Sequence, residues 1–134
     1  MSFLLDTNIL SAHLRGRSDT TNRFVQYSGR LYTPSLVMAE LYVWAFRRPD
    51  PTEILSAIEK MLCYEVAVVN YDNDCALTFG RIRAELQREG IGVNPIDLMI
   101  ASVALTHDLT LVTHNTSDFH RIPNLRLEDW IAAR

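Results

Sequence analysis

The 134-residue chain is poor in several residue types, and each shortage narrows its class. Its two cysteines, Cys63 and Cys75, have no Cys or His partner at metal-ligand spacing, so we expect buried, reduced thiols and no structural zinc site. No run of about 18 apolar residues occurs, which argues against a membrane-spanning helix, and the N-terminus lacks a basic signal-like region. These features predict a cytoplasmic protein without membrane attachment.

Positive charge is also scarce, with 13 Lys and Arg against 16 Asp and Glu and a formal net charge of −3. This balance argues against a protein that coats nucleic acid through bulk electrostatics, although it does not exclude nucleic acid as a substrate. Lys60 is the only lysine, and the other twelve basic residues are arginines. The planar arginine fork suits bidentate phosphate contacts, although a bias in composition explains the same excess.

The hydrophobic content of 48% is enough for a compact core in a chain of this length. No repeat or low-complexity linker occurs, and the longest polar interruption, residues 13–23, is too short to separate two domains. We therefore expect one domain over residues 1–134.

Short apolar runs alternate with helical patterns along the chain. Strands are predicted over residues 3–5, 30–34, 64–70 and 110–113, and a short strand followed by a final helix within 124–133. Helices are predicted over residues 8–15, 20–29, 35–48, 52–62, 72–90 and 94–107. Because no Asn-Gly or Asp-Gly hairpin turn separates the strands, this order predicts an α/β fold with a parallel sheet of four to five strands and helices on both faces.

Acidic residues fall at corresponding places in this pattern. Asp6 ends the first strand, and Asp118 follows the strand 110–113. Glu40 lies on the helix after the second strand, and Asp97 lies in the first turn of the helix 94–107. Since the carboxyl ends of parallel strands share one edge, all four carboxylates are expected to meet there. Three of the acids also have a structural alternative. Asp6 can cap the following helix, Asp97 can be a favourable first-turn charge, and Asp118 can be a turn residue.

Glu40 has no such alternative, because it is the only charged residue between positions 36 and 46. We expect its carboxylate to be buried and to need either a distant arginine or a bound cation. A cation explains the other acids too, because clustered carboxylates repel one another without one. Oxygen-only ligands favour Mg²⁺ or Mn²⁺, and one such ion or two would support phosphodiester hydrolysis.

Four blocks of the chain together resemble PIN-domain proteins, in particular the VapC-type toxins of toxin-antitoxin pairs. The blocks are LLDTNIL, SLVMAEL, GRIRAELQREGIGVNPIDLMIASVAL and LVTHNTSDFHRIPNLRLEDW. The resemblance implies a Rossmann-like, three-layer PIN fold and a Mg²⁺- or Mn²⁺-dependent endoribonuclease that arrests translation. It also implies inhibition by a VapB-type antitoxin that binds operon DNA, together with homodimers and toxin-antitoxin hetero-oligomers.

The resemblance assigns roles by position in this sequence. It implies that Asp6, Glu40, Asp97 and Asp118 are the catalytic and metal-binding acids. Orienting groups would be Thr7, Asn8, Thr113 and Asn115. In many relatives an acid occupies the position of Asn115, and in others the acid comes three residues later, as Asp118 does here. This leaves open whether Asn115 or Asp118 contributes more.

RNA recognition is predicted less specifically. Candidate phosphate contacts are Arg47, Arg48, Arg81, Arg83, Arg88 and Arg121, of which the last four are preferred, and a solvated helix face is the alternative for each. Relatives similar in the RIRAEL and RIPNLRLEDW blocks cut structured RNA, notably the anticodon stem-loop of initiator tRNA. On the helix 35–48, Tyr42, Trp44 and Phe46 cannot all face one side. That helix is therefore either buried on both faces or part of a groove for an antitoxin or a second copy.

Other classes fit the residues less well. A phosphotransfer receiver needs paired acids after the first strand, and Asp6 has no acidic neighbour. A haloacid-dehalogenase-like phosphatase needs Asp-x-Asp there, whereas the second position is Asn8. The non-enzymatic alternative is an inactive PIN domain that binds RNA or protein without cutting.

Overall fold

The computed structural model describes residues 1–131 and contains one parallel sheet. Its strands, in the spatial order β3-β2-β1-β4-β5, are β1 (Phe3–Leu5), β2 (Leu31–Pro34), β3 (Ala67–Val69), β4 (Thr110–Val112) and β5 (Leu127–Glu128). Every neighbouring pair is parallel. The predicted α/β class and parallel sheet are thus confirmed, with five strands.

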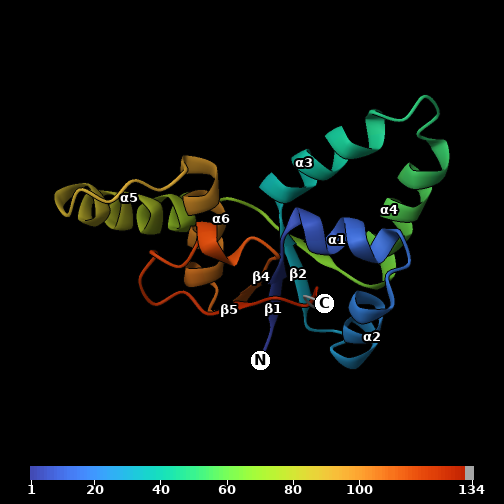
Figure 1. The fold of residues 1–134 in the computed structure, drawn as a ribbon, viewed down its shortest axis with the longest axis horizontal. Helices are drawn as coiled ribbons and strands as arrows, with labels where there is room; N and C mark the ends of the chain where they lie inside the picture. Colours follow the sequence, from blue (N-terminus) through green and yellow to red (C-terminus); the bar gives the residue numbers. More distant parts are fainter. Residues whose placement is uncertain (132–134) are drawn as a thin grey trace.

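Helices connect the strands and cover the sheet (Figure 1). They are α1 (Thr7–Leu14), α2 (Ser18–Gln26), α3 (Ser35–Phe46), α4 (Thr52–Tyr64), α5 (Asn73–Arg88) and α6 (Pro95–Thr106), with a 3₁₀ turn, η1 (Thr116–Asp118), before β5. The chain moves from β1 outward to β3 and then crosses back to β4. Because such crossovers are right-handed, α1 to α4 lie on one face and α5 and α6 on the other.

The central strands are buried because both of their faces are covered. Leu4, Leu5 and Leu111 are fully inaccessible to solvent, which explains why β1 and β4 are continuous apolar runs rather than alternating patterns. The register pairs Leu4 with Leu111 and Leu5 with Val112. The residues that follow these two strands, Asp6 and Thr113, therefore emerge side by side at the same edge of the sheet.

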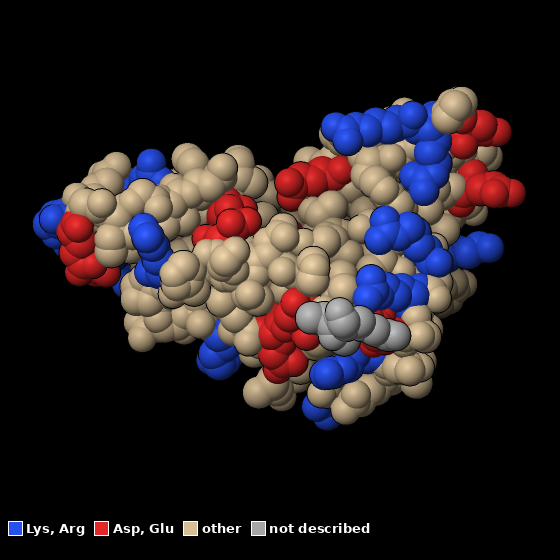
Figure 2. All heavy atoms as spheres, viewed as in Figure 1, with Lys and Arg blue, Asp and Glu red and all other residues tan. Residues whose placement is uncertain are grey.

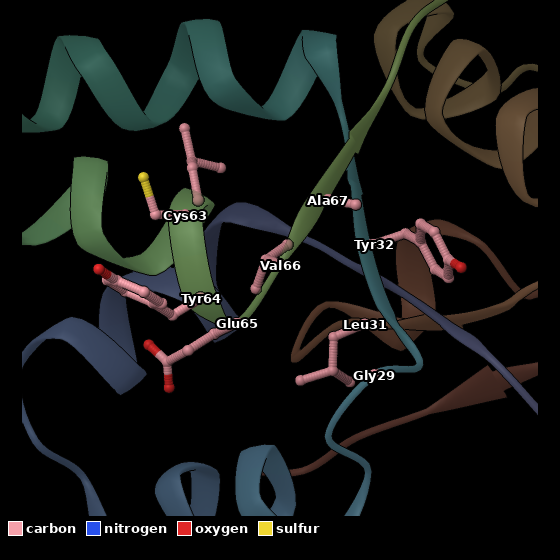
Figure 3. Close-up of a pocket in the computed structure, with 9 residues that line it drawn as sticks. Gly29, Leu31, Tyr32, Cys63, Tyr64, Glu65, Val66 and Ala67 are labelled. Carbon is pink, nitrogen blue, oxygen red and sulfur yellow. The ribbon is translucent and has the colours of Figure 1, made fainter.

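The β3 edge is more open than the centre of the sheet. A depression of about 210 Å³ lies there between the end of α4 and the start of β2 (Figure 3). Tyr64 at its rim is 84% exposed, and Val68 on β3 is also exposed. Glu65 is the only acidic residue that lines it, so this depression is not the predicted metal site.

Some local predictions were wrong. Residues 129–131 are not helical, and the rest of the expected final helix lies outside the described residues. Cys63 is exposed, whereas Cys75 is buried as predicted, and both thiols are free. The interpretation of α3 as buried on both faces is also wrong, because Tyr42 and Phe46 are 37% and 63% exposed. None of the helices in residues 1–131 is long and apolar enough to cross a membrane.

Candidate metal and nuclease site

Asp6 occupies the junction between β1 and α1. Its Oδ1 accepts a hydrogen bond of 2.8 Å from the Thr7 backbone N–H, so it caps α1, as the structural alternative required. Its Oδ2 accepts a 2.7 Å bond from the Thr113 hydroxyl at the end of β4. Burial raises the pKa of Asp6, and the nearby Asp118 charge raises it further, while the bonds from Thr113 and Thr7 oppose this shift. Capping alone does not require a buried carboxylate between two strand ends.

Glu40 lies in the second turn of α3, the helix that follows β2. The Thr7 hydroxyl donates a 3.0 Å hydrogen bond to its Oε1, which holds the carboxylate toward Asp6. Glu40 is exposed rather than buried, so the predicted desolvation cost was wrong. The apolar residues around it in the sequence include Tyr42 and Phe46, which are themselves exposed, and therefore they do not enclose it.

Asp97 lies in the first turn of α6, where Asn94 caps the helix. The Asn94 side chain accepts bonds of 2.8 Å from the Ile96 N–H and 3.3 Å from the Asp97 N–H. Partial burial, followed by the charges of Asp118, Asp6 and Glu40, raises the pKa of Asp97 to about 6. All three other predicted acids therefore act electrostatically on this one carboxyl group.

Asp118 is exposed at the end of η1, close to Asp97. The two residues line the same open depression of about 280 Å³, together with Gly92, Val93, Asn94, Ser117, His120 and Arg121. The Asn115 N–H donates a 3.1 Å bond to the Thr113 hydroxyl, so Asn115 acts on Asp6 only through that hydroxyl. Asn115 does not line the depression, whereas Asp118 does.

The four acids are linked by their charges rather than by contact: Asp97 and Asp118 line one depression, and the charges of Asp118, Asp6 and Glu40 all act on Asp97. Acidic side chains flank the notch between α3 and α6 in Figure 2. Among residues 1–131, no three of the four carboxylates bring oxygens within 4.8 Å of one another. Oxygen donors at such a spacing can hold a hard cation partly through its water molecules.

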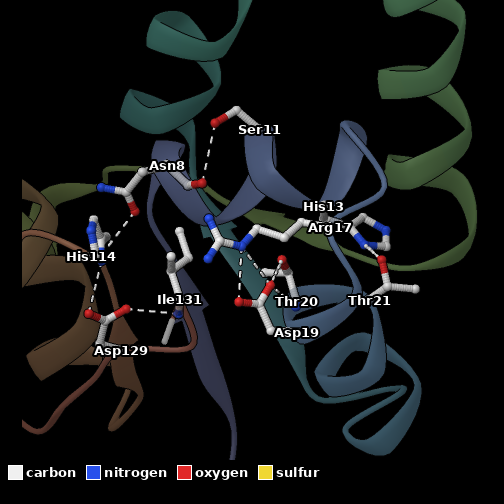
Figure 4. Close-up of polar contacts among 10 residues, drawn as sticks. All are labelled: Asn8, Ser11, His13, Arg17, Asp19, Thr20, Thr21, His114, Asp129 and Ile131. Carbon is white, nitrogen blue, oxygen red and sulfur yellow. Dashed lines mark hydrogen bonds and ion pairs between the residues drawn. The ribbon is translucent and has the colours of Figure 1, made fainter. Parts of the chain in front are cut away.

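Asn8 fixes the loop that carries Asp118. Its side-chain oxygen accepts a 3.1 Å bond from the His114 N–H, and the His114 ring contacts Asp129 at 3.0 Å (Figure 4). Asn8 therefore ties the start of α1 to the segment after β4. All four predicted orienting residues make hydrogen bonds that hold the acids or their loops: Thr7, Asn8, Thr113 and Asn115. Asn8 bonds to a backbone N–H rather than to a carboxylate.

The four preferred arginines do not gather at one place. Arg121 lines the depression beside Asp97 and Asp118. Arg83 is half-buried and donates a 2.9 Å bond to the Val93 carbonyl, so it supports the loop before α6. Arg81 and Arg88 are exposed on α5 and do not line this depression. Ser117 was not predicted for the site, because nothing in its local pattern distinguishes it from an ordinary turn residue.

Comparison with known proteins agrees with this architecture. Residues 3–125 match the PIN domain family, and the chain belongs to that family. It resembles the "tRNA(fMet)-specific endonuclease VapC" of Salmonella typhimurium, with 35% identity over 131 residues, covering 97% of this chain and 98% of that protein. The protein of the same description from Shigella flexneri is 37% identical over 131 residues, with the same coverage.

Solved structures give the same result at the level of the fold. The chain superposes on a chain of the DNA-bound VapBC complex from Salmonella typhimurium with a TM-score of 0.88 and 35% sequence identity. The match covers 97% of this chain and 98% of that one. The predicted PIN-like architecture and VapC-type resemblance are therefore confirmed.

Proposed function

We propose that this chain is the toxin of a toxin-antitoxin pair and a divalent-metal-dependent endoribonuclease, formed by a single PIN domain over residues 1–134. The observation that carries the proposal is the placement of the acids: Asp97 and Asp118 line one open depression, and Thr7 bonds both Asp6 and Glu40. In support, burial and then the charges of Asp118, Asp6 and Glu40 raise the pKa of Asp97. Acids that repel one another at a solvent-open edge are typical of a cation site. The VapC relatives, described as nucleases, supply the reaction class.

The residues present fit a hard divalent cation, Mg²⁺ or Mn²⁺. The donor set consists of carboxylate oxygens, with no sulfur or imidazole among the four acids. Asp6 and Asp97 are the proposed direct ligands, and Glu40 and Asp118 the outer ones. When bound, the cation would activate water and neutralise charge on the scissile phosphodiester.

The chain's own residues hold this arrangement in place. Thr113 and the Thr7 N–H fix both oxygens of Asp6, so its carboxylate needs little reorganisation. The Thr7 hydroxyl also donates a hydrogen bond to Glu40, which ties this carboxylate to the residue next to Asp6. Arg121 lines the depression beside the acids, where its guanidinium suits an RNA phosphate. No side chain is required as a covalent nucleophile.

Initiator tRNA is the proposed substrate, because both nuclease relatives described above are named for tRNA(fMet) and match nearly end to end. Cleavage in the anticodon stem-loop would arrest translation, and the proposed location is the cytoplasm, where this RNA is found. An inactive RNA-binding PIN domain is not favoured, since all four predicted acids are present.

A VapB-type antitoxin is the proposed partner, because the similar Salmonella chain lies in a VapBC complex bound to DNA. The exposed apolar side chains on α3, Tyr42, Val43 and Phe46, offer a surface for it or for a second copy of the toxin. This surface adjoins Glu40 on the same helix, so a partner there would also restrict access to the acids.

The test uses purified chain, initiator tRNA and total RNA, with Mg²⁺ or with EDTA. We expect Asp6→Asn to fold, because Asn is also a good helix cap and its amide can bond Thr113. Its cleavage rate should fall by more than about 100-fold, while the exposed-residue control Glu59→Gln cleaves normally. Cleavage by Asp6→Asn at the wild-type rate would reject the site. Cuts outside initiator tRNA would reject only the substrate.

A further inference from the structure

A second group of ligand-type side chains lies at the other end of α6. Asp72, Cys75 and His107 bring a carboxylate oxygen, a thiol sulfur and an imidazole nitrogen within 4.8 Å of one another. The Cys75 Sγ is 4.0 Å from the His107 Nε2. Within residues 1–131 this is the only group of three or more such side chains at that spacing.

The fold, rather than local spacing, assembles this group. Asp72 is the N-cap of α5, and its Oδ1 accepts a 3.0 Å bond from the Cys75 N–H. His107 is the C-cap of α6 and lies 32 residues after Cys75 in the chain. The start of α5 is thus adjacent to the end of α6. The sequence shows no Cys or His at metal-ligand spacing from Cys75, and the partner that the fold supplies, His107, is distant in sequence.

We propose that Asp72, Cys75 and His107 form a binding site for a borderline transition-metal ion of the Zn²⁺ type, with solvent water as the fourth ligand. Thiolate and imidazole ligands select such an ion over Mg²⁺, in contrast to the four carboxylates at the other end of α6. Metal binding would break the Cys75 S–H bond and form a metal–sulfur bond, with one proton released to solvent. His107 would bind as neutral imidazole.

The geometry needs little change to accept the ion. With Zn–S near 2.3 Å and Zn–N near 2.0 Å, tetrahedral coordination places sulfur and nitrogen roughly 3.5 Å apart, compared with 4.0 Å in the structure. Asp72 keeps Oδ1 on the Cys75 N–H, which leaves Oδ2 for the metal. The N-terminus of α5 would stabilise the thiolate through the helix dipole.

The solvent exposure of the three side chains suits a metal ion that exchanges with solution. The Cys75 side chain is fully buried, whereas Asp72 and His107 are exposed, so the open coordination position would face solvent. Residues 97 and 107 are ten positions apart on α6, or about 15 Å, so this site is separate from the acids.

The first test is Co²⁺ titration of the full chain in saturating Mg²⁺, which keeps the oxygen site occupied. We expect a thiolate-to-Co²⁺ charge-transfer band together with visible bands of tetrahedral coordination. The band should persist in Cys63→Ser, which removes the other thiol, and disappear in Cys75→Ser. Absence of the band in wild type, or its loss in Cys63→Ser but not in Cys75→Ser, would overturn the proposal.

The second test does not depend on Cys75→Ser folding. Zn²⁺ at about a hundredfold excess over Kd should raise Tm by roughly 5 to 10 °C in the same Mg²⁺ buffer. Most of this shift should be lost in His107→Ala, which changes an exposed residue, and in Asp72→Asn, which retains the helix cap. A wild-type shift in both variants would overturn the site even if metal binds elsewhere.

Discussion

Replacing Asp97 by Asn should stabilise the metal-free protein at neutral pH. The folded-state pKa of Asp97 is about 6, against an ordinary value of 3.8. Between these values the folded chain holds a proton that the unfolded chain has lost, so wild-type stability falls as pH rises from about 4 to 6. Above pH 6 the whole penalty is present, and Asp97→Asn removes it.

The expected gain can be worked out from the shift. About two pKa units correspond to about 3 kcal/mol at 1.36 kcal/mol per unit. Asp97 is only partly buried, so solvent screening reduces this figure to about 1.5 kcal/mol. Loss of a favourable first-turn acid in α6 takes back about 0.5 kcal/mol. The net stabilisation of Asp97→Asn should therefore be about 1 kcal/mol.

Urea unfolding in EDTA at pH 7.5 and at pH 4.5 measures this effect. The gain should be present at pH 7.5, small at pH 4.5, and reversed when Mg²⁺ is added, because wild type alone binds the ion tightly. The exposed control Glu59→Gln should change stability by less than about 0.5 kcal/mol at either pH. An Asp97→Asn protein that is less stable at pH 7.5 without metal, or equally stabilised at both pH values, would refute the electrostatic reasoning.

Two further predictions concern the support of the site and its access to RNA. In Thr113→Val, Asp6 loses its 2.7 Å hydroxyl donor. The free energy of unfolding in urea should therefore fall by about 1–3 kcal/mol, and Mg²⁺ binding should weaken by about 10- to 100-fold. Unchanged metal affinity would contradict this prediction. Arg121 lines the depression beside the acids, so Arg121→Ala should weaken RNA binding measured by fluorescence anisotropy. The slope of log affinity against log salt concentration should fall by about 1 in this variant and stay unchanged in Arg88→Ala. Equal effects of the two variants would remove Arg121 from the site.

Much of the fold was predictable because buried parallel strands are apolar and alternate with helices along the chain, whereas the order of the strands in the sheet was not predicted. The runs at β1 and β4 are short, unbroken and enclosed on both faces, so they differ clearly from amphipathic helices. The positions of Asp6 and Asp97 follow from the same pattern, since a strand end and a helix start are both visible in the sequence. Their mutual electrostatic effect then follows from the shared sheet edge.

The remaining features depend on which faces the fold leaves uncovered. The apolar composition of α3 suggested that Glu40 is enclosed, but nothing within residues 1–131 covers Tyr42, Val43 and Phe46 completely. Local sequence cannot distinguish a core helix from one that keeps an apolar face for a partner. The contact between Cys75 and His107 depends on how α5 packs on α6, which no spacing within either helix reveals.

Anomalous diffraction from crystals of the chain soaked in Mn²⁺ tests the central claim most directly. We expect a peak at the carboxyl edge of the sheet, within about 2.0 to 2.3 Å of oxygens from Asp6 and Asp97, with Glu40 and Asp118 directed toward its water ligands. A well-occupied Mn²⁺ elsewhere on the molecule, with the four acids free of metal, would contradict the account.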